Sequence, residues 1–170
     1  IYCVQFMTFK NDELGMKCLR WWAERCLEWC FARYEDGKFG DQKYLDDWTI
    51  RFQGIHVLKH LGGGLAPWNI RNYHVTAGPR VDDIPGVFYH YHNFRAYAGG
   101  RFNLCLATYR LSPEAIQYLY MPYLEAFQRA RAQVRAIDGS YARDILPSER
   151  GWLPILRTVK RKLLGVDYVV

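Results

Sequence analysis

The chain carries in its first half the stretch Phe-Gly-Asp-Gln-Lys-Tyr-Leu, at residues 39–45. A Leu-Ala-Pro-Trp-Asn segment follows at residues 65–69, and the run Val-Phe-Tyr-His-Tyr-His occupies residues 87–92. The first block predicts a glycine turn that opens a short helix, the second an irregular loop around a proline, and the third a strand. Each block is short, so their order along the chain is what bears on the fold.

Two polar residues open the short helix that is predicted over residues 41–48. A carboxylate beside an amide can accept hydrogen bonds from sugar hydroxyls and donate to them at the same time. Asp41 and Gln42 are therefore the candidate catalytic residues. Asp41 can also serve as an ordinary helix cap, and its spacing by itself favours that simpler role.

Two histidines stand two residues apart on the predicted strand, His90 and His92. Residues at this spacing point to one face of a strand. Imidazole binds a metal through one nitrogen and can donate a hydrogen bond from the other, which suits a metal or diphosphate site. No further ligand stands at zinc spacing, so a zinc centre is not indicated. Trp68 is a candidate for stacking on a sugar, although packing against its own loop is the commoner role of such a ring.

The composition is that of a packed globular chain. It has 170 residues, of which 50% are hydrophobic and 16% aromatic, and it predicts one domain over residues 1–170. No apolar run reaches membrane-spanning length and no leader is recognised, so we expect a cytoplasmic protein. The 5 cysteines, an odd number, do not indicate a disulfide framework. The net charge of +6 is not accompanied by a nucleic-acid motif, so nucleic acid is not an expected partner.

Much of the positive charge gathers near the end of the sequence, on Arg150, Arg157, Lys160, Arg161 and Lys162. Apolar residues interleave with these cations at helical spacing. Residues 153–164 therefore predict an amphipathic basic helix, and the segment Trp152–Leu164 suits contact with an anionic membrane surface. A solvated helix docked on the core is the commoner outcome for such a pattern.

The remaining periodicity predicts a mixed α/β chain with strands early and helices late. Strands are expected at residues 1–9 and 55–58, and weak strands around a turn within residues 75–85. A helix capped by Asn11-Asp12 is expected to run to about residue 33. Another begins at Ser112-Pro113 and runs to about residue 137, where Pro122 kinks or splits it.

The order of these blocks resembles the C-terminal half of a bacterial GT-A type nucleotide-sugar glycosyltransferase, distantly similar to the family 8, glycogenin-like enzymes. Residues 1–12 resemble the family's strand, Phe-Arg-Asn-Asp and helix element, and residues 39–45 its Asp-Gln motif. Residues 88–92 resemble its strand ending in His-Phe-x-Gly, and residues 100–111 the tail of that bacterial branch. The resemblance implies the C-terminal part of an α/β GT-A fold, a small mixed sheet with flanking helices.

The resemblance also implies roles for single residues. His90 becomes the ligand of a divalent cation, Mn or Mg, and His92 its neighbour in the substrate site. Asp41 and Gln42 contact the sugar and the acceptor, and Arg95 neutralises phosphate charge. Trp68 and Asn69, in the Pro-Trp-Asn loop, complete the candidate substrate-binding set. The implied partners are a nucleotide-sugar donor and an acceptor.

The chain departs from the family pattern in two places. Asn93 stands where the motif has glycine, and Phe94-Arg95 replaces the Lys-Pro-Trp ending. No Asp-x-Asp motif and no nucleotide-binding half precede the first block. We therefore expect the acceptor-side half of a transferase, completed by a missing N-terminal half or a partner chain. The alternative is a non-catalytic binding or scaffolding module at a membrane surface.

Overall fold

The structure is a computed structural model that describes residues 2–147 and 152–169, together with the side chains of all of these except residues 153, 168 and 169. The chain gathers into two compact units, unit 1 (Ile1–Lys59) and unit 2 (His60–Val170), and each has its own buried cluster. The single domain over residues 1–170 stays a prediction. The α/β class is confirmed in general, as helices with small sheets.

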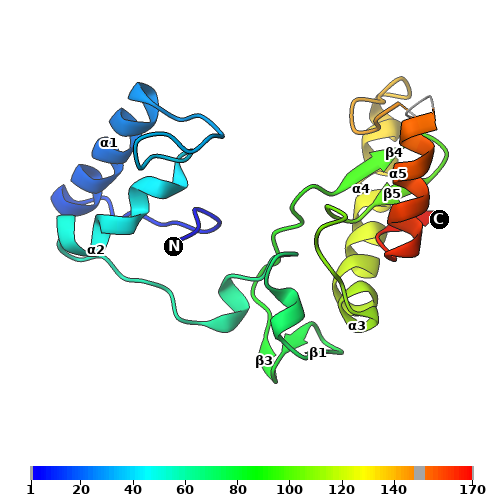
Figure 1. The fold of residues 1–170 in the computed structure, drawn as a ribbon, viewed down its shortest axis with the longest axis horizontal. Helices are drawn as coiled ribbons and strands as arrows, with labels where there is room; N and C mark the ends of the chain where they lie inside the picture. The colour runs from blue at the N-terminus through cyan, green and yellow to red at the C-terminus, as the bar shows by residue number, and fades with distance from the viewer. Residues whose placement is uncertain (1, 148–151, 170) are drawn as a thin grey trace. The chain divides into compact units, whose positions relative to one another are not determined.

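Unit 1 is built around one long helix, α1 (Glu13–Glu28), shown in blue in Figure 1. Asp12 is its N-cap, as predicted: the backbone N–H of Gly15 donates to the Asp12 carboxylate at 2.9 Å. The helix ends at Glu28, five residues before the expected residue 33, because Trp29 turns to extended backbone at φ −157°.

The predicted helix over residues 41–48 is present in a tighter form. A 3₁₀ helix, η1 (Gln42–Asp47), leads directly into the short helix α2 (Trp48–Arg51). Leu45 and Trp48 of these elements are buried in one cluster with Cys18 of α1. Aromatic rings pack edge-on around them, among them Phe9, Trp22 and Phe52.

Two predicted strands of unit 1 are wrong. Residues 2–9 and 55–58 form no strand, and Ile1 lies outside the described residues. Tyr2, Val4, Met7 and Phe9 instead pack their side chains against the α1 cluster, as Ile55 does. An apolar run can bury its side chains without a strand partner, and without a partner there is no hydrogen-bonded ladder.

Unit 2 contains two small antiparallel sheets among its described residues. The first joins β1 (Val75–Thr76), β2 (Arg80–Val81) and β3 (Ile84–Pro85), which confirms the weak strands predicted there. The second has the order β4 (Arg95–Tyr97), β5 (Arg101–Asn103) and β6 (Asp167–Val169). Two short 3₁₀ helices, η2 (Leu61–Gly63) and η3 (Ile70–Asn72), precede the sheets.

The long helical segment of unit 2 follows the predicted signals closely. Ser112 caps α3 (Pro113–Ala115), which continues through a π-helical turn, η4 (Ile116–Tyr120), into α4 (Met121–Ile137). The π turn directly precedes Pro122, which has no N–H to donate into a regular helix. The predicted break is thus confirmed as a π turn. A final helix, α5 (Trp152–Leu163), lies beside β6 (Figure 1).

The core of unit 2 lies between the sheets and the α3–η4–α4 segment. Its buried members come from β1, β2, β4 and β5, from the α3–η4–α4 segment and from the chain between these elements. They include Leu65 before the first sheet and Leu124 on α4. Tyr120 and Leu104 are completely buried within it. This core fixes the loops that carry the candidate site residues of unit 2.

Candidate functional site

The candidate residues fall into two groups, one in each unit. Asp41 and Gln42 belong to unit 1, and Trp68, Asn69, His90, His92 and Arg95 belong to unit 2. Within unit 2 the structure brings most of its group together.

Four rings of unit 2 form one exposed cluster, which we call the aromatic–histidine cluster: Trp68, His90, His92 and Tyr109. The Trp68 ring centroid lies 5.4 Å from that of His90 and 5.5 Å from that of His92. The two imidazoles stack with centroids 5.7 Å apart and planes 22° apart. Tyr109 lies 6.3 Å from Trp68 and 6.2 Å from His92. Segments far apart in the sequence thus meet at one surface.

The loop that carries Trp68 is closed by the side chain of Asn69. The Asn69 amide oxygen accepts from the backbone N–H of Ala66 at 2.9 Å, and its amide nitrogen donates to the Gly64 carbonyl at 2.8 Å. Asn69 therefore holds the loop, and Trp68 remains 38% exposed beside the histidines. The predicted substrate contact of Asn69 stays a prediction.

The segment of residues 87–92 was predicted as a strand, which is wrong. Its only β-bridge within the described residues is an isolated parallel one between Tyr89 and Leu65, with the His90 N–H donating to the Leu65 carbonyl at 2.8 Å. The alternation of a strand is nevertheless kept: the hydroxyl of Tyr91 donates to the Leu119 carbonyl at 3.0 Å, inside the unit. His90 and His92 are exposed on the opposite side. The prediction that both histidines share a face is confirmed.

A tight turn follows the histidines. Asn93 has φ +61°, in the left-handed region, and the N–H of Phe94 donates to the Tyr91 carbonyl at 3.1 Å. Glycine and asparagine are the residues that adopt this region most readily. Asparagine can therefore replace glycine here without changing the course of the backbone.

A glycine fixes the neighbouring loop against the histidine segment. The carbonyl of Gly62 accepts the N–H of Val87 at 2.8 Å, and a Cβ at Gly62 would lie 2.1 Å from the Pro85 carbonyl oxygen. Only a residue without a side chain fits at so close a backbone approach. Gly62 therefore positions the histidine segment.

Arg95, at the start of β4, lies beside the turn. Its Nε donates to the side-chain oxygen of Asn93 at 3.0 Å, and the side chain is exposed. The guanidinium has donors to spare for an anion, because one bond uses only one of its five N–H groups.

The electrostatics of the cluster favour neutral imidazole. Partial burial lowers the pKa of His90, and the neighbouring His92 lowers it further. Neutral imidazole is the form that binds a metal or accepts a hydrogen bond.

The histidines provide only part of the ligand set that a divalent cation needs. Among the described residues, no three His, Cys, Asp or Glu side chains are gathered as a metal site requires. Two imidazoles fit a cation only as part of a shell completed by oxygen donors, since Mg²⁺ takes six ligands, mostly oxygen.

In unit 1, Asp41 stands at the N-terminus of η1 and its side chain makes no capping hydrogen bond. Its backbone carbonyl accepts from Trp22 Nε1 at 3.0 Å, which fixes the position of the residue. Within residues 2–147 and 152–169, neither the Asp41 carboxylate nor the Gln42 amide forms a side-chain hydrogen bond or ion pair. The capping role that the spacing favoured is therefore absent, and both polar groups remain available.

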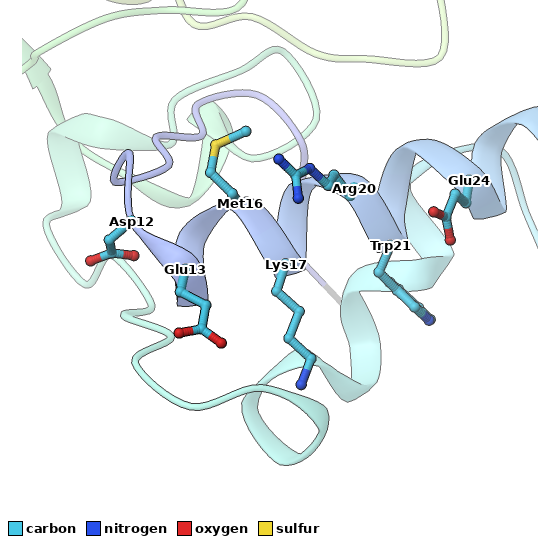
Figure 2. Close-up of a pocket in the computed structure, with 7 residues that line it drawn as sticks. All are labelled: Asp12, Glu13, Met16, Lys17, Arg20, Trp21 and Glu24. Atoms are coloured by element: carbon cyan, nitrogen blue, oxygen red, sulfur yellow. The ribbon is translucent and has the colours of Figure 1, made fainter.

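A surface depression of unit 1 lies apart from Asp41 and Gln42. It follows one side of α1, from Asp12 to Glu24, and Figure 2 shows its lining side chains projecting from this single helix. With its lining confined to α1 and the cap residue, it is an open helix face. We do not place a substrate there.

The sequence reasoning gave no functional role to Tyr109, the fourth ring of the cluster. It lies in the tail stretch of residues 100–111, and the pair Tyr109-Arg110 in the loop after β5 was a usable signal. Its contact with Trp68 joins residues 41 positions apart, which no local pattern reveals.

Comparison with known proteins finds relatives of unknown role. The chain is 33% identical over 148 residues to the uncharacterized protein YfnD of Bacillus subtilis (strain 168), covering 84% of this chain and 47% of YfnD. It is 32% identical over 123 residues to the uncharacterized protein YfnF of the same organism, covering 70% of this chain and 41% of YfnF. The chain thus spans less than half the length of these curated relatives. No protein-family model and no solved structure matches it.

Proposed function

We propose that the protein is the acceptor-side part of a GT-A type glycosyltransferase, which transfers a sugar from a nucleotide diphosphate donor to an acceptor hydroxyl. One observation carries the proposal: the exposed aromatic–histidine cluster, with its histidines on the turn His90-Tyr91-His92-Asn93. The left-handed Asn93 supports the correspondence with the His-Phe-x-Gly motif, because that position requires the conformation for which glycine is suited. The GT-A fold is part of the same proposal.

The chemistry of the cluster suits a diphosphate and a sugar. His90, kept neutral by its lowered pKa, would be a ligand of the divalent cation or a hydrogen-bond donor to a phosphate oxygen. Trp68 offers an exposed ring face to the sugar or the base, since aromatic rings stack on such surfaces. The Arg95 guanidinium would pair with phosphate oxygens.

A bound Mn²⁺ or Mg²⁺ would stabilise the negative charge that grows on the leaving diphosphate. His92, stacked on His90, would hold the His90 ring in its orientation. Asp41 and Gln42 keep unpaired polar groups at the start of η1, and their proposed role is to orient the sugar and the acceptor hydroxyl.

The test uses the natural full-length protein beside the 170-residue chain. Titration calorimetry with UDP in the presence and absence of Mn²⁺ measures binding, and release of UDP from UDP-sugars measures turnover. We expect His90→Ala to lower Mn²⁺-dependent binding of UDP by at least about tenfold, as loss of a metal-site group commonly does. His74→Ala is the matched control, because His74 is an exposed histidine of the same unit outside the cluster.

Unchanged UDP affinity and Mn²⁺ dependence in His90→Ala would refute the role of His90. Absence of UDP binding by the full-length protein, with and without Mn²⁺, would refute the transferase itself. That second result would favour the alternative, a non-catalytic binding module.

A further inference from the structure

The last helix of unit 2 presents its apolar side to solvent. Between 50% and 83% of the surface of each of its five outward apolar side chains is exposed: Trp152, Ile155, Leu156, Val159 and Leu163. On a helix with 3.6 residues per turn these five positions fall within about 100° of the circumference. They form one continuous stripe, which we call the α5 stripe.

The opposite side of α5 carries half-buried residues, namely Pro154, Thr158 and Arg161. There the Arg101 guanidinium donates to the Thr158 hydroxyl at 3.3 Å, and the helix ends where the N–H of Val166 donates to the Arg161 carbonyl at 3.1 Å. A surface helix normally turns its apolar stripe toward the core. The reversed orientation in α5 leaves the stripe for a partner outside unit 2.

The charges around the stripe indicate the kind of partner. Lys160 and Lys162 border it on its two sides, and Arg157 lies further around the helix on the side of Lys160. All three are exposed, and none of them forms an ion pair among the described residues. The helix contains no acidic residue. Arg150 and the side chain of Leu153 lie outside the described residues.

We propose that α5 docks on an anionic phospholipid surface, with the α5 stripe inserted at the level of the headgroups and the flanking cations paired with lipid phosphates. Apolar stripe, cationic borders and a terminal tryptophan are the features of a helix that lies in a membrane interface. Among the described residues, no helix combines the length and apolar composition needed to cross a bilayer. The inference concerns a surface outside the aromatic–histidine cluster and does not depend on the proposed function.

The experiment measures vesicle flotation with the natural full-length protein and with the 170-residue chain. Vesicles are made of phosphatidylcholine alone or mixed with phosphatidylglycerol. We expect binding to the anionic vesicles that weakens as salt is added, because the lipid charge is screened. Ile155→Ser with Val159→Ser should lower the partition coefficient at least about tenfold, because two inserted apolar side chains are lost.

A charge variant tests the other half of the surface without touching the apolar stripe. Each cation near an anionic surface raises the partition coefficient about fivefold. Lys160→Gln with Lys162→Gln should therefore lower that coefficient about 25-fold. Ile137→Ser is the control for the apolar change, since Ile137 is 92% exposed at the end of α4. Arg71→Gln with Arg135→Gln is the control for the charges, because both lie exposed on other elements.

Three outcomes would overturn the proposal. Failure of the full-length protein to bind anionic vesicles, even if the 170-residue chain binds, would mean that another segment of the same protein covers the stripe. Equal binding by the α5 variants and their controls would place membrane contact elsewhere. Self-association in sedimentation, abolished by the serine variant and without vesicle binding, would identify a second copy as the occupant.

Discussion

Unit 1 and unit 2 bury their apolar residues in different ways. Among the described residues of unit 1, 3 hydrophobic residues are buried, and its core depends on large rings packed edge-on around Trp48. The core cluster of unit 2 has 11 buried members among the described residues, from both sheets, the continuous helical segment α3–η4–α4 and the chain between these elements. Unit 1 is a helix with extended chain packed against it, whereas unit 2 contains hydrogen-bonded sheets and carries the aromatic–histidine cluster on loops fixed by its core.

This difference in burial affects the stability of each unit and the support of the aromatic–histidine cluster. A unit of about 60 residues buries a smaller fraction of its surface than a larger one, so each of its few buried side chains carries a large share of its stability. In unit 2 the burial is spread over many side chains, and the loops of the aromatic–histidine cluster are tied to that core by Tyr91 and Gly62. We therefore expect unit 1 to open more readily than unit 2.

The largest effect is expected from Trp48→Ala in unit 1. Removing a buried tryptophan costs about 3–5 kcal/mol, and Trp48 contacts three other rings. The readout is alkylation of Cys18 in unit 1 and Cys105 in unit 2, followed peptide by peptide. Both thiols are buried, and burial raises the pKa of each, that of Cys105 to about 12, so they react only on opening.

We expect faster labelling of Cys18 and unchanged labelling of Cys105 in Trp48→Ala. The control is Leu27→Ala, because Leu27 is 88% exposed on the same helix α1. If alkylation of Cys18 and Cys105 were accelerated together, the two units would open as one, and the expected difference in their stability would be contradicted.

Leu124→Ala tests unit 2 by the same readout. The side chain is 2% exposed in the core, and such a truncation costs about 2–5 kcal/mol. Labelling of Cys105 should accelerate while that of Cys18 stays unchanged. Because the remaining core is larger, we expect far-ultraviolet circular dichroism of this variant to stay native at room temperature.

A smaller effect is expected at the turn after the histidines. Asn93→Val places a β-branched residue at φ +61° and should destabilise unit 2 by about 1–2 kcal/mol. Asn93→Gly should change the free energy of unfolding by less than about 0.5 kcal/mol. Asn72→Val is the control, since Asn72 is exposed and has no positive φ. If urea unfolding showed that Asn93→Val and Asn72→Val lose the same free energy of unfolding, the role of the left-handed turn would be contradicted.

The smallest effect concerns acid stability of unit 1. The hydrogen bond from the Gly15 N–H lowers the pKa of Asp12, and Lys10 lowers it further. A carboxyl whose folded pKa lies below its unfolded value stabilises the fold fully above about pH 4, and this stabilisation is lost as the pH falls through the folded pKa.

Asp12→Asn keeps a capping acceptor and should remove this pH dependence, whereas Asp12→Ala should also weaken α1 at neutral pH. Hydrogen exchange of the α1 amides between pH 7 and pH 3 measures both effects. If the α1 amides of Asp12→Asn lost protection between pH 7 and pH 3 as much as those of the unmodified chain, the loss of stability in acid would belong to another group.

Local signals in the sequence were sufficient for the helices. The Asp12 cap, the Ser112-Pro113 start and the break at Pro122 each act within one turn of chain, so the structure confirms them. The predicted strands at residues 2–9, 55–58 and 87–92 fail for a common reason. A strand needs a second strand to accept its hydrogen bonds, and the apolar pattern of one segment does not say whether that partner exists.

The candidate site divides in the same way. The sequence determined which side chains can bind phosphate or sugar, and the two-residue spacing of His90 and His92 determined that they share a face. Only the tertiary structure decided that Trp68 and Tyr109 lie against those histidines, that Asn69 is used to hold its loop, and that the apolar stripe of α5 faces outward. Chemical character and local geometry are properties of neighbouring residues, whereas contacts between distant segments depend on how the whole unit packs.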